Sequence, residues 1–325
     1  MRVVTISTPG GPDVLVESEL PDPVPRTGEV LIDVAAAGVN RADILQRQGR
    51  YPPPPGAPTW PGLEVSGTVG ALGPGVSGWS VGDRVCALLS GGGYADRVAV
   101  PASQLLPVPP GLDLVDAAAL PEAVCTGWSS LVDAGRLSPD EWVLVQGGSG
   151  GVGTVAIQLA VALGARVAAT AGGPERTARC TELGAELVID HRTEDFTRAV
   201  IDATDGRGVD VVLDVLGAGA LTANLEALAP GGRLVVIGMQ RGRDAELDLG
   251  LLLARRASII GTVLRSRPAQ EKAALVAAVH THVWPMLDDG RLLPVVHARL
   301  PLGRAGEAHE LLDSGQVFGK VLLVP

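Results

Sequence analysis

The segment at residues 142–163 reads WVLVQGGSGGVGTVAIQLAVAL: an apolar strand, a glycine-rich turn and an apolar helix follow one another directly. Gly148, Gly150 and Gly153 form a G-x-G-x-x-G pattern at the turn. In this context glycines allow a tight turn and close approach of the backbone to a pyrophosphate, while the helix N-terminus offers unpaired N–H groups. The segment predicts a dinucleotide-binding strand–turn–helix unit; a glycine loop without a ligand is the alternative. The expected loop residues are Gly148, Ser149, Gly150, Gly151, Val152 and Gly153.

The same alternation of strand and helix continues along the chain. Each apolar strand segment is followed by a helix-length segment, which predicts a doubly wound, Rossmann-type parallel sheet of six strands. The expected strands are residues 142–146, 166–170, 186–190, 209–216, 233–238 and 258–264.

The two ends of the chain have a different pattern. Up to about residue 120, short apolar runs such as 29–34 and 82–89 alternate with Gly, Pro and Asp, which is typical of a strand-rich domain. The C-terminal segment has strands at 292–300 and 320–324 around a helix near 303–313, and it is too short to fold alone. We therefore expect an α/β protein with two domains. The first is residues 1–121 completed by 268–325, and the second is residues 122–267.

Composition limits the possible functions. The chain has 325 residues, 46% of them hydrophobic and 19% charged, which is enough for two cores. Its net charge of −10 opposes nucleic-acid binding unless a local basic patch exists. Cys86, Cys125 and Cys180 lie far apart, which fits a reducing cytoplasmic location rather than a disulfide framework or a zinc ribbon. The sequence predicts neither a signal peptide nor a transmembrane span, because glycines interrupt the longest uncharged stretch.

The end of the second predicted strand bears on the choice of dinucleotide. A carboxylate about 20 residues beyond the glycine loop normally binds the ribose 2′-hydroxyl of NAD. Here residues 170–176 read TAGGPER, so Gly172 and Gly173 leave room for a 2′-phosphate and Arg176 can pair with it. The pattern favours NADPH.

Other residues near this strand leave the choice open. If Glu175 rather than Arg176 faced the ribose, NAD would be preferred, and both residues can also be surface residues of the next helix. His191 and Arg192, just after the third strand, are further candidates for the adenosine phosphate edge.

Several segments together resemble one family. Residues 40–56 (NRADILQRQGRYPPPPG) and 62–67 (GLEVSG) resemble the zinc-independent quinone oxidoreductase branch of the medium-chain dehydrogenase/reductase superfamily. Further segments match in the same order: GGGYA at 91–95, AAALPEA at 117–123, the loop at 147–153 and LRSR at 264–267. The resemblance implies a GroES-like catalytic domain rejoined by the C-terminus and a Rossmann domain that binds the cofactor. It also implies association through that domain into a homodimer or a tetramer, of which we expect the homodimer.

The resemblance also distinguishes this chain from the zinc alcohol dehydrogenases of the same superfamily. Where those have a G-H-E segment, this chain reads Gly62-Leu63-Glu64, and where they have their first cysteine ligand it reads Gly38-Val39-Asn40-Arg41. Its five histidines and three cysteines show no clustered ligand spacing, so no metal is predicted. Glu64 is expected to hydrogen-bond locally.

Without a Lewis acid, an electron-poor acceptor is the easiest substrate to reduce, because its conjugated system spreads the negative charge. The sequence therefore predicts hydride transfer from nicotinamide C4 of NADPH to a quinone or related conjugated carbonyl. Water or a weak donor would supply the proton, and no obligatory side-chain acid or base is evident.

The resemblance implies roles for individual residues. Asn40 orients a carbonyl or the nicotinamide, or it caps the helix after it. Tyr51 places a phenol above the quinone, or it packs on the prolines at 52–55. Asp43 is an acid/base candidate, although a charged first-turn residue is the simpler interpretation. Cys125 lacks a sequence cue for a thiolate.

Five residues, one of them already named in the loop, complete the expected cofactor site. Gly238 and Met239 follow the fifth strand, where a ligand crevice is expected, although Met239 can equally fill the core. The others are taken from the resemblance: Thr126, Val152 and Leu264.

Two other functions remain open. An enoyl-thioester or 2-alkenal reductase would share the hydride step, but it would need a proton donor such as Tyr51 and a basic entrance for a phosphopantetheine. A crystallin-like protein would bind NADPH or RNA without turnover, although the net charge disfavours RNA.

Overall fold

The computed structural model describes residues 1–325. The chain forms two compact units: unit 1 is Met1–Cys125, Leu264–Asp288 and Pro294–Pro325, and unit 2 is Thr126–Val263 and Asp289–Leu293. The chain passes from unit 1 to unit 2 within helix α2 (Pro121–Trp128). None of the helices has the length and apolar character needed to cross a membrane.

Unit 2 contains a parallel sheet of six strands in the order β10-β9-β8-β11-β12-β13. This confirms the predicted doubly wound sheet. The strands are β8 (Trp142–Val145), β9 (Arg166–Ala171), β10 (Leu187–Asp190), β11 (Val209–Asp214), β12 (Leu228–Val236) and β13 (Ser258–Gly261).

Some strand ends differ from the prediction. The β11 strand ends at Asp214, two residues early, because its carboxylate accepts the N–H groups of Leu216 and Gly217 and turns the chain. The β12 strand also begins earlier than predicted, at Leu228 rather than at residue 233. Its pairing with β11 shifts register between Val209 and Val211, and the apolar pattern of the sequence does not show such a shift.

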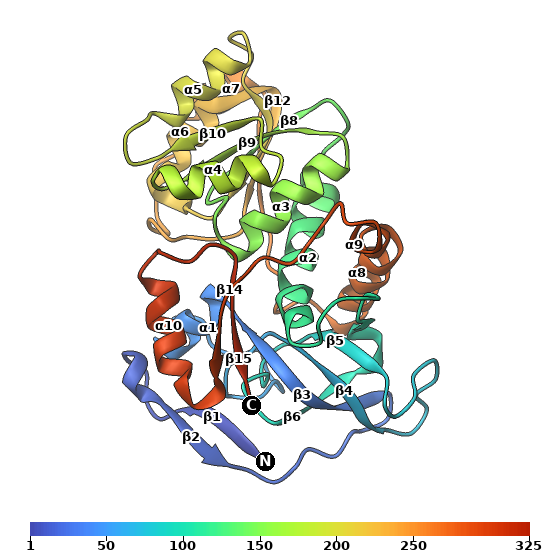
Figure 1. Ribbon diagram of the computed structural model, residues 1–325. Helices are drawn as coiled ribbons and strands as arrows, with labels where there is room; N and C mark the ends of the chain where they lie inside the picture. Colours follow the sequence, from blue (N-terminus) through green and yellow to red (C-terminus); the bar gives the residue numbers. More distant parts are fainter. The chain divides into compact units, whose positions relative to one another are not determined.

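Helices cover both faces of this sheet (Figure 1). The α3 and α4 helices contact β8, β9 and β10, whereas α5, α6 and α7 pack their apolar residues into a core with the buried strand residues. The helices are α3 (Gly151–Ala162), α4 (Pro174–Glu182), α5 (Phe196–Ala203), α6 (Leu221–Ala227) and α7 (Leu249–Arg255).

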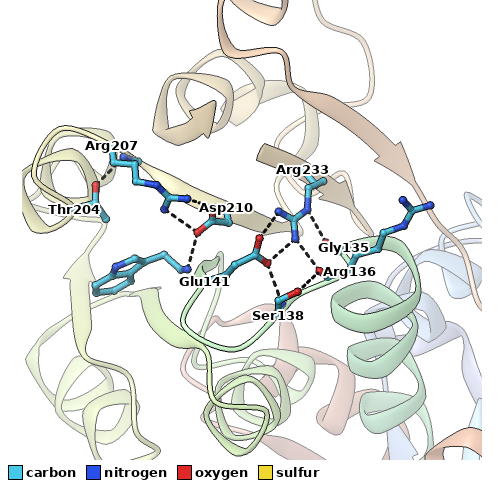
Figure 2. A network of polar contacts seen from close by, with 10 residues as sticks. Gly135, Arg136, Ser138, Glu141, Thr204, Arg207, Asp210 and Arg233 are labelled. Carbon is cyan, nitrogen blue, oxygen red and sulfur yellow. Dashed lines mark hydrogen bonds and ion pairs between the residues drawn. The ribbon is translucent and has the colours of Figure 1, made fainter. Parts of the chain in front are cut away.

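A polar network stabilises unit 2 near the amino ends of β8 and β11 (Figure 2). Arg233 pairs in a bidentate manner with Glu141, at 2.9 and 2.7 Å. Asp210 accepts the backbone N–H of Trp142 at 2.9 Å and pairs with Arg207. Because the glycine loop follows the opposite, carboxyl end of β8, we assign this network to stability rather than to ligand binding.

Unit 1 contains a seven-stranded sheet with the path β14-β15-β3-β4-β5-β7, on which β6 pairs with β3, and a separate pair β1-β2. The C-terminal strand β15 pairs antiparallel with β3, so the end of the chain completes the N-terminal sheet. The strands are β1 (Arg2–Ile6), β2 (Leu15–Glu19), β3 (Glu29–Val39), β4 (Glu64–Leu72), β5 (Arg84–Leu88), β6 (Arg97–Pro101), β7 (Leu105–Pro107), β14 (Val296–Pro301) and β15 (Lys320–Val324).

Four helices lie wholly in unit 1: α1 (Arg41–Arg47), α8 (Ala269–His282), α9 (Trp284–Asp288) and α10 (Ala305–Asp313). The strand β14 begins later than predicted, after Pro294, which has no N–H to donate to a ladder. The main core consists mostly of Val, Leu, Ile and Ala, with Tyr94 as its one aromatic member.

Candidate functional site

The glycine loop joins β8 to α3 in unit 2. Its first turn is fixed by Thr170, whose hydroxyl accepts the N–H of Gly147 at 3.0 Å and whose carbonyl accepts that of Gly148 at 2.8 Å. A Cβ on Gly153 would lie 2.2 Å from the carbonyl oxygen of Gly147, so the helix and loop can pack this closely only with glycine there.

Gly150 differs from the other glycines of the pattern. A Cβ there would meet only the Gly147 carbonyl oxygen, at 3.4 Å, and its φ of −76° is open to any residue. The fold itself therefore does not require glycine at this position. The open space beside Gly150 is compatible with the predicted approach of a pyrophosphate to the N-terminus of α3.

Three nitrogen-bearing side chains gather around Gly172 at the end of β9. A Cβ on Gly172 would lie 3.0 Å from Arg192 Nε, 3.0 Å from His191 Nε2 and 3.1 Å from an Arg176 guanidinium nitrogen. Arg176 Nε also donates to the Gly172 carbonyl at 2.6 Å, while Glu175 is exposed. We call Arg176, His191 and Arg192 the Gly172 cluster; such a concentration of donors suits an anionic group.

One carboxylate lies beside this cluster. Asp190 accepts the backbone N–H of Arg192 at 3.1 Å, and hydrogen bonds from the Gly173 and Arg192 backbones lower the pKa of its carboxyl. Gly173 itself has a φ of +87° and forms the N-cap of α4. The Asp190 carboxylate thus holds the loop backbone.

The remaining predicted residues of unit 2 are less concentrated. Thr126 and Val152 are half-buried in α2 and in the first turn of α3, and Gly238 is half-buried just after β12. Met239 is 60% exposed, so the alternative that it fills the core is wrong. Leu264 is buried and belongs to unit 1.

In unit 1, the buried Glu64 and Lys320 and the half-buried Asn40 form a cluster, which we call the Glu64 cluster. Glu64 Oε1 pairs with Lys320 Nζ and accepts Asn40 Nδ2 at 2.8 Å, and Lys320 Nζ also donates to Asn40 Oδ1 at 2.7 Å. Glu64 Oε2 accepts the backbone N–H of Glu122 at 2.9 Å. A Cβ on Gly38 would lie 2.3 Å from Glu64 Oε1, so the carboxylate fills the space of the missing side chain.

Asn40 stands at the N-cap of α1, as one of its two expected roles requires, and it forms a capping box with Asp43, whose carboxylate accepts the Asn40 N–H at 2.8 Å. Its side-chain amide also bonds Glu64 and Lys320. The role in orienting a carbonyl or the nicotinamide stays a prediction.

Asp43 lies in the first turn of α1, as the sequence suggested, but its carboxylate does not face solvent. It is fully buried, and it also accepts the backbone N–H of Gly62 at 2.8 Å. Burial raises the pKa of its carboxyl to about 6, against the effect of these two hydrogen bonds. The sequence around Asp43 alone cannot show that the face of α1 that carries Asp43 packs against residues 62–64.

Tyr51 is half-buried, and burial raises the pKa of its phenol. The Arg265 guanidinium carbon lies 5.3 Å from its ring centroid. Arg265 is only 3% exposed and donates to Gln46 Oε1 at 2.7 Å, to the Ser90 carbonyl at 2.8 Å and to the Tyr51 carbonyl at 3.3 Å. Arg265 therefore holds the Tyr51 segment in place.

The three cysteines are free and buried, and burial raises the pKa of the Cys125 thiol well above its usual value. Four charged residues near these groups were missed by sequence reasoning: Glu122, Arg265, Lys272 and Lys320. For Glu122 and Lys320 the signal was a charged residue inside an otherwise apolar stretch, as in GKVLLV at residues 319–324, whereas Arg265 and Lys272 lie in a polar segment without such a signal.

The comparisons with known proteins agree with this arrangement. Residues 26–110 match the alcohol dehydrogenase GroES-like domain, and residues 151–280 match the zinc-binding dehydrogenase family. A GroES-like unit combined with a dinucleotide-type unit defines the medium-chain class of oxidoreductases.

The chain belongs to the medium-chain dehydrogenase/reductase superfamily. It is 34% identical to the quinone oxidoreductase of Rattus norvegicus over 100% of this chain and 98% of that protein. It is 35% identical, over 98% of its length, to part of a phenolphthiocerol/phthiocerol polyketide synthase polypeptide of Mycobacterium tuberculosis, but there it spans only 14% of the relative's length. The solved quinone oxidoreductase of Escherichia coli, complexed with NADPH, is 29% identical with a TM-score of 0.90, and each chain is covered completely.

Proposed function

We propose that this protein is an NADPH-dependent quinone oxidoreductase that transfers hydride without zinc. The observation that carries the proposal is the Glu64 cluster, because its carboxylate is already engaged by an ammonium, an amide and a backbone N–H. Glu64 is thus neutralised and held by protein groups, which makes it a poor ligand for a metal. A reaction without a Lewis acid favours an acceptor that stabilises its own negative charge, such as a quinone.

The cofactor choice follows from the Gly172 cluster. Arg176, His191 and Arg192 offer side-chain nitrogens where a 2′-phosphate is expected, and the glycine loop offers backbone N–H groups to the pyrophosphate. The NADPH in the Escherichia coli relative supports the same choice. The bound cofactor supplies the hydride. The proposed cofactor residues are Asn40, Thr126, Gly148, Ser149, Gly150, Gly151, Val152, Gly153, Gly172, Gly173, Arg176, His191, Gly238, Met239 and Leu264.

Two residues of unit 1 are proposed to position the substrate. The amide of Asn40 is held rigidly by Glu64 and Lys320, so it can orient a carbonyl without reorganising. Tyr51 is backed by the Arg265 guanidinium and provides a flat ring for an aromatic acceptor.

The test follows oxidation of NADPH and NADH in parallel with 1,4-benzoquinone, 9,10-phenanthrenequinone, a crotonyl thioester and a 2-alkenal. We expect quinone turnover with NADPH to be fastest, with no zinc in the purified protein by elemental analysis. Inactivity with both quinones but rapid crotonyl turnover would establish the enoyl-thioester reductase, which the polyketide synthase match supports as a second candidate. Stoichiometric zinc that restores activity would refute the zinc-free reaction.

We also propose a homodimer that associates through unit 2. Strand β13 pairs only with β12 and lies at the edge of the sheet. Ile259 on this strand and Leu249 and Leu253 on α7 are 39%, 63% and 75% exposed, so the edge offers both unpaired backbone and apolar surface. Light scattering should give twice the chain mass, and Ile259→Lys should shift it toward the monomer.

The compact units also support catalytic and cofactor domains close to residues 1–121 with 268–325 and residues 122–267. A reducing cytoplasmic location stays a prediction; the three free cysteines support it.

A further inference from the structure

Glu122 in the first turn of α2 has no assigned role. The residue keeps part of its surface exposed, but its Oε2 atom is buried and has no hydrogen-bond partner. A buried carboxylate oxygen without a donor is unfavourable when ionised, whereas a protonated carboxyl tolerates the same place far better. The local geometry therefore favours the neutral acid.

The Glu64 cluster explains which of two neighbouring carboxyls carries the charge. Lys320 and Asn40 are both bound to Glu64, and the backbone N–H of Glu122 also points at Glu64. Two carboxyls that share a site do not both ionise easily. Glu64 thus has the hydrogen-bond donors that a carboxylate needs, whereas Glu122 Oε2 has none and is better suited to the protonated form.

Two buried cations reduce the free-energy cost of ionising Glu122. Lys272 and Arg265 are 2% and 3% exposed and bind Ser90 and other neutral acceptors, and neither forms an ion pair with a carboxylate. Both interact electrostatically with Glu122, so they stabilise it once it loses its proton.

The balance of these groups places the acid near neutrality. Burial, and next the charge of Glu64, raise the pKa of Glu122 to about 8, while Lys320 and Lys272 act in the opposite direction. The titratable and charged groups that interact with Glu122 are Asp43, Tyr51, Glu64, Cys125, Arg265, Lys272 and Lys320.

We propose that Glu122 is the proton source for the reduced acceptor. This inference rests on the proposed quinone reduction. Hydride from nicotinamide C4 carries two electrons and one hydrogen to the quinone, which becomes a hydroquinone monoanion. The O–H bond of Glu122 breaks, its proton neutralises that anion, and the Glu122 carboxylate then regains a proton from water. Glu64 accepts both the backbone N–H of Glu122, at 2.9 Å, and the amide of Asn40, a proposed substrate-positioning residue, at 2.8 Å, and these shared contacts bring the proton source to the substrate side of unit 1.

The test compares Glu122→Gln with wild type and with Glu310→Gln, which removes an exposed carboxyl of α10. Glutamine keeps the neutral shape but has no proton to transfer. We expect kcat with 1,4-benzoquinone to fall about tenfold to hundredfold, at the low end of general-acid effects because water is a substitute donor. The NADPH Kd should stay within about twofold of wild type, since the variant leaves the nucleotide residues intact.

The pH profile separates this role from a structural one. Wild-type kcat should decline above pH of about 8 as Glu122 ionises. Glu122→Gln should lose this decline, and Glu310→Gln should keep it. An unchanged kcat or an unchanged alkaline limb in Glu122→Gln would overturn the inference while leaving quinone reduction intact.

A second measurement does not depend on activity. Infrared difference spectroscopy of a pH titration should show a protonated carboxyl band at pH 7 that Glu122→Gln lacks. If wild type reduces no quinone, the proposed function fails. Absence of the carboxyl band contradicts the proton source whether or not the quinone assay succeeds.

Discussion

The Gly172 cluster in unit 2 and the Glu64 cluster in unit 1 use charge in opposite ways. In the first, Arg176 from the first turn of α4 and His191 and Arg192 from the segment after β10 gather around Gly172, and their side chains are partly or fully exposed. In the second, the buried charges of Glu64 on β4 and Lys320 on β15 neutralise each other across the intervening strand β3. The exposed cluster is suited to attract an anion from solution, and the buried one holds polar groups in fixed positions.

The contrast has an energetic consequence. A partly solvated cationic cluster changes ligand affinity with little effect on the fold, and salt screens it. A buried pair affects stability when one partner is lost, because the other charge is left without compensation. Substitutions in the two clusters should therefore separate stability from cofactor affinity.

The largest effect is expected from Lys320→Met. This change leaves Glu64 buried without its ammonium partner, so the free energy of unfolding should fall by about 3–5 kcal/mol. Chemical denaturation followed by fluorescence measures it. Adding Glu64→Gln to Lys320→Met removes the unpaired carboxylate and should recover part of the lost free energy of unfolding. A loss below about 1 kcal/mol in the single variant would show that the pair behaves like a surface ion pair.

A smaller loss is expected from Gly153→Ala in the nucleotide loop. The added Cβ would lie 2.2 Å from the Gly147 carbonyl oxygen, so the helix and loop must separate, at about 1–3 kcal/mol. NADPH affinity by fluorescence titration should weaken together with stability. Gly261→Ala is the matched control, because nothing lies within 4 Å of a Cβ there. Equal behaviour of the two variants would argue against close packing as the reason for Gly153.

Arg176→Ala should act on affinity while leaving the fold intact. A hydrogen bond to a charged group contributes about 1.5–3 kcal/mol, so NADPH should bind about tenfold to hundredfold more weakly while NADH binding stays the same. The NADPH affinity of wild type should also fall more steeply with salt than that of the variant. Arg198→Ala removes an exposed arginine of α5 and should change neither affinity. An unchanged preference for NADPH over NADH would remove Arg176 from the site.

The two clusters also differ in how far the sequence reveals them. Gly172, Arg176 and His191 lie within 20 positions of one another, and the strand–turn–helix pattern predicts that they share one edge of the sheet. Lys320 meets Asn40 across 280 positions and Glu64 across 256, through the pairing of β15 with β3 and of β3 with β4. Local periodicity predicts that these strands exist but not which of them are neighbours. Asn40 and Tyr51 were therefore available only from the resemblance, and Glu122 and Lys320 were missed.

A buried histidine in unit 1 should have the smallest of these effects on the free energy of unfolding. The pH dependence that it causes has the opposite sign to that caused by the buried acids. His309 is 0% exposed, its Nε2 lies 3.0 Å from the Tyr94 hydroxyl, and its Nδ1 has no partner. Burial, assisted by Arg47, lowers the pKa of His309 to about 3. Below pH 6.5 His309 therefore binds a proton in the unfolded chain but not in the folded chain, and the free energy of unfolding decreases as the pH falls.

The comparison of wild type with His309→Gln isolates this contribution. Asp43, whose pKa is raised to about 6, has the opposite effect, since folding retains its proton and stability increases as the pH falls through this range. Both proteins contain Asp43, so its effect cancels in the difference. Between pH 7 and pH 5.5 wild type should lose about 1 kcal/mol that the variant keeps, measured by urea denaturation at each pH. If the two proteins lose stability in parallel, the folded protein must accept the proton on His309, and the unpaired Nδ1 is the atom that would receive it.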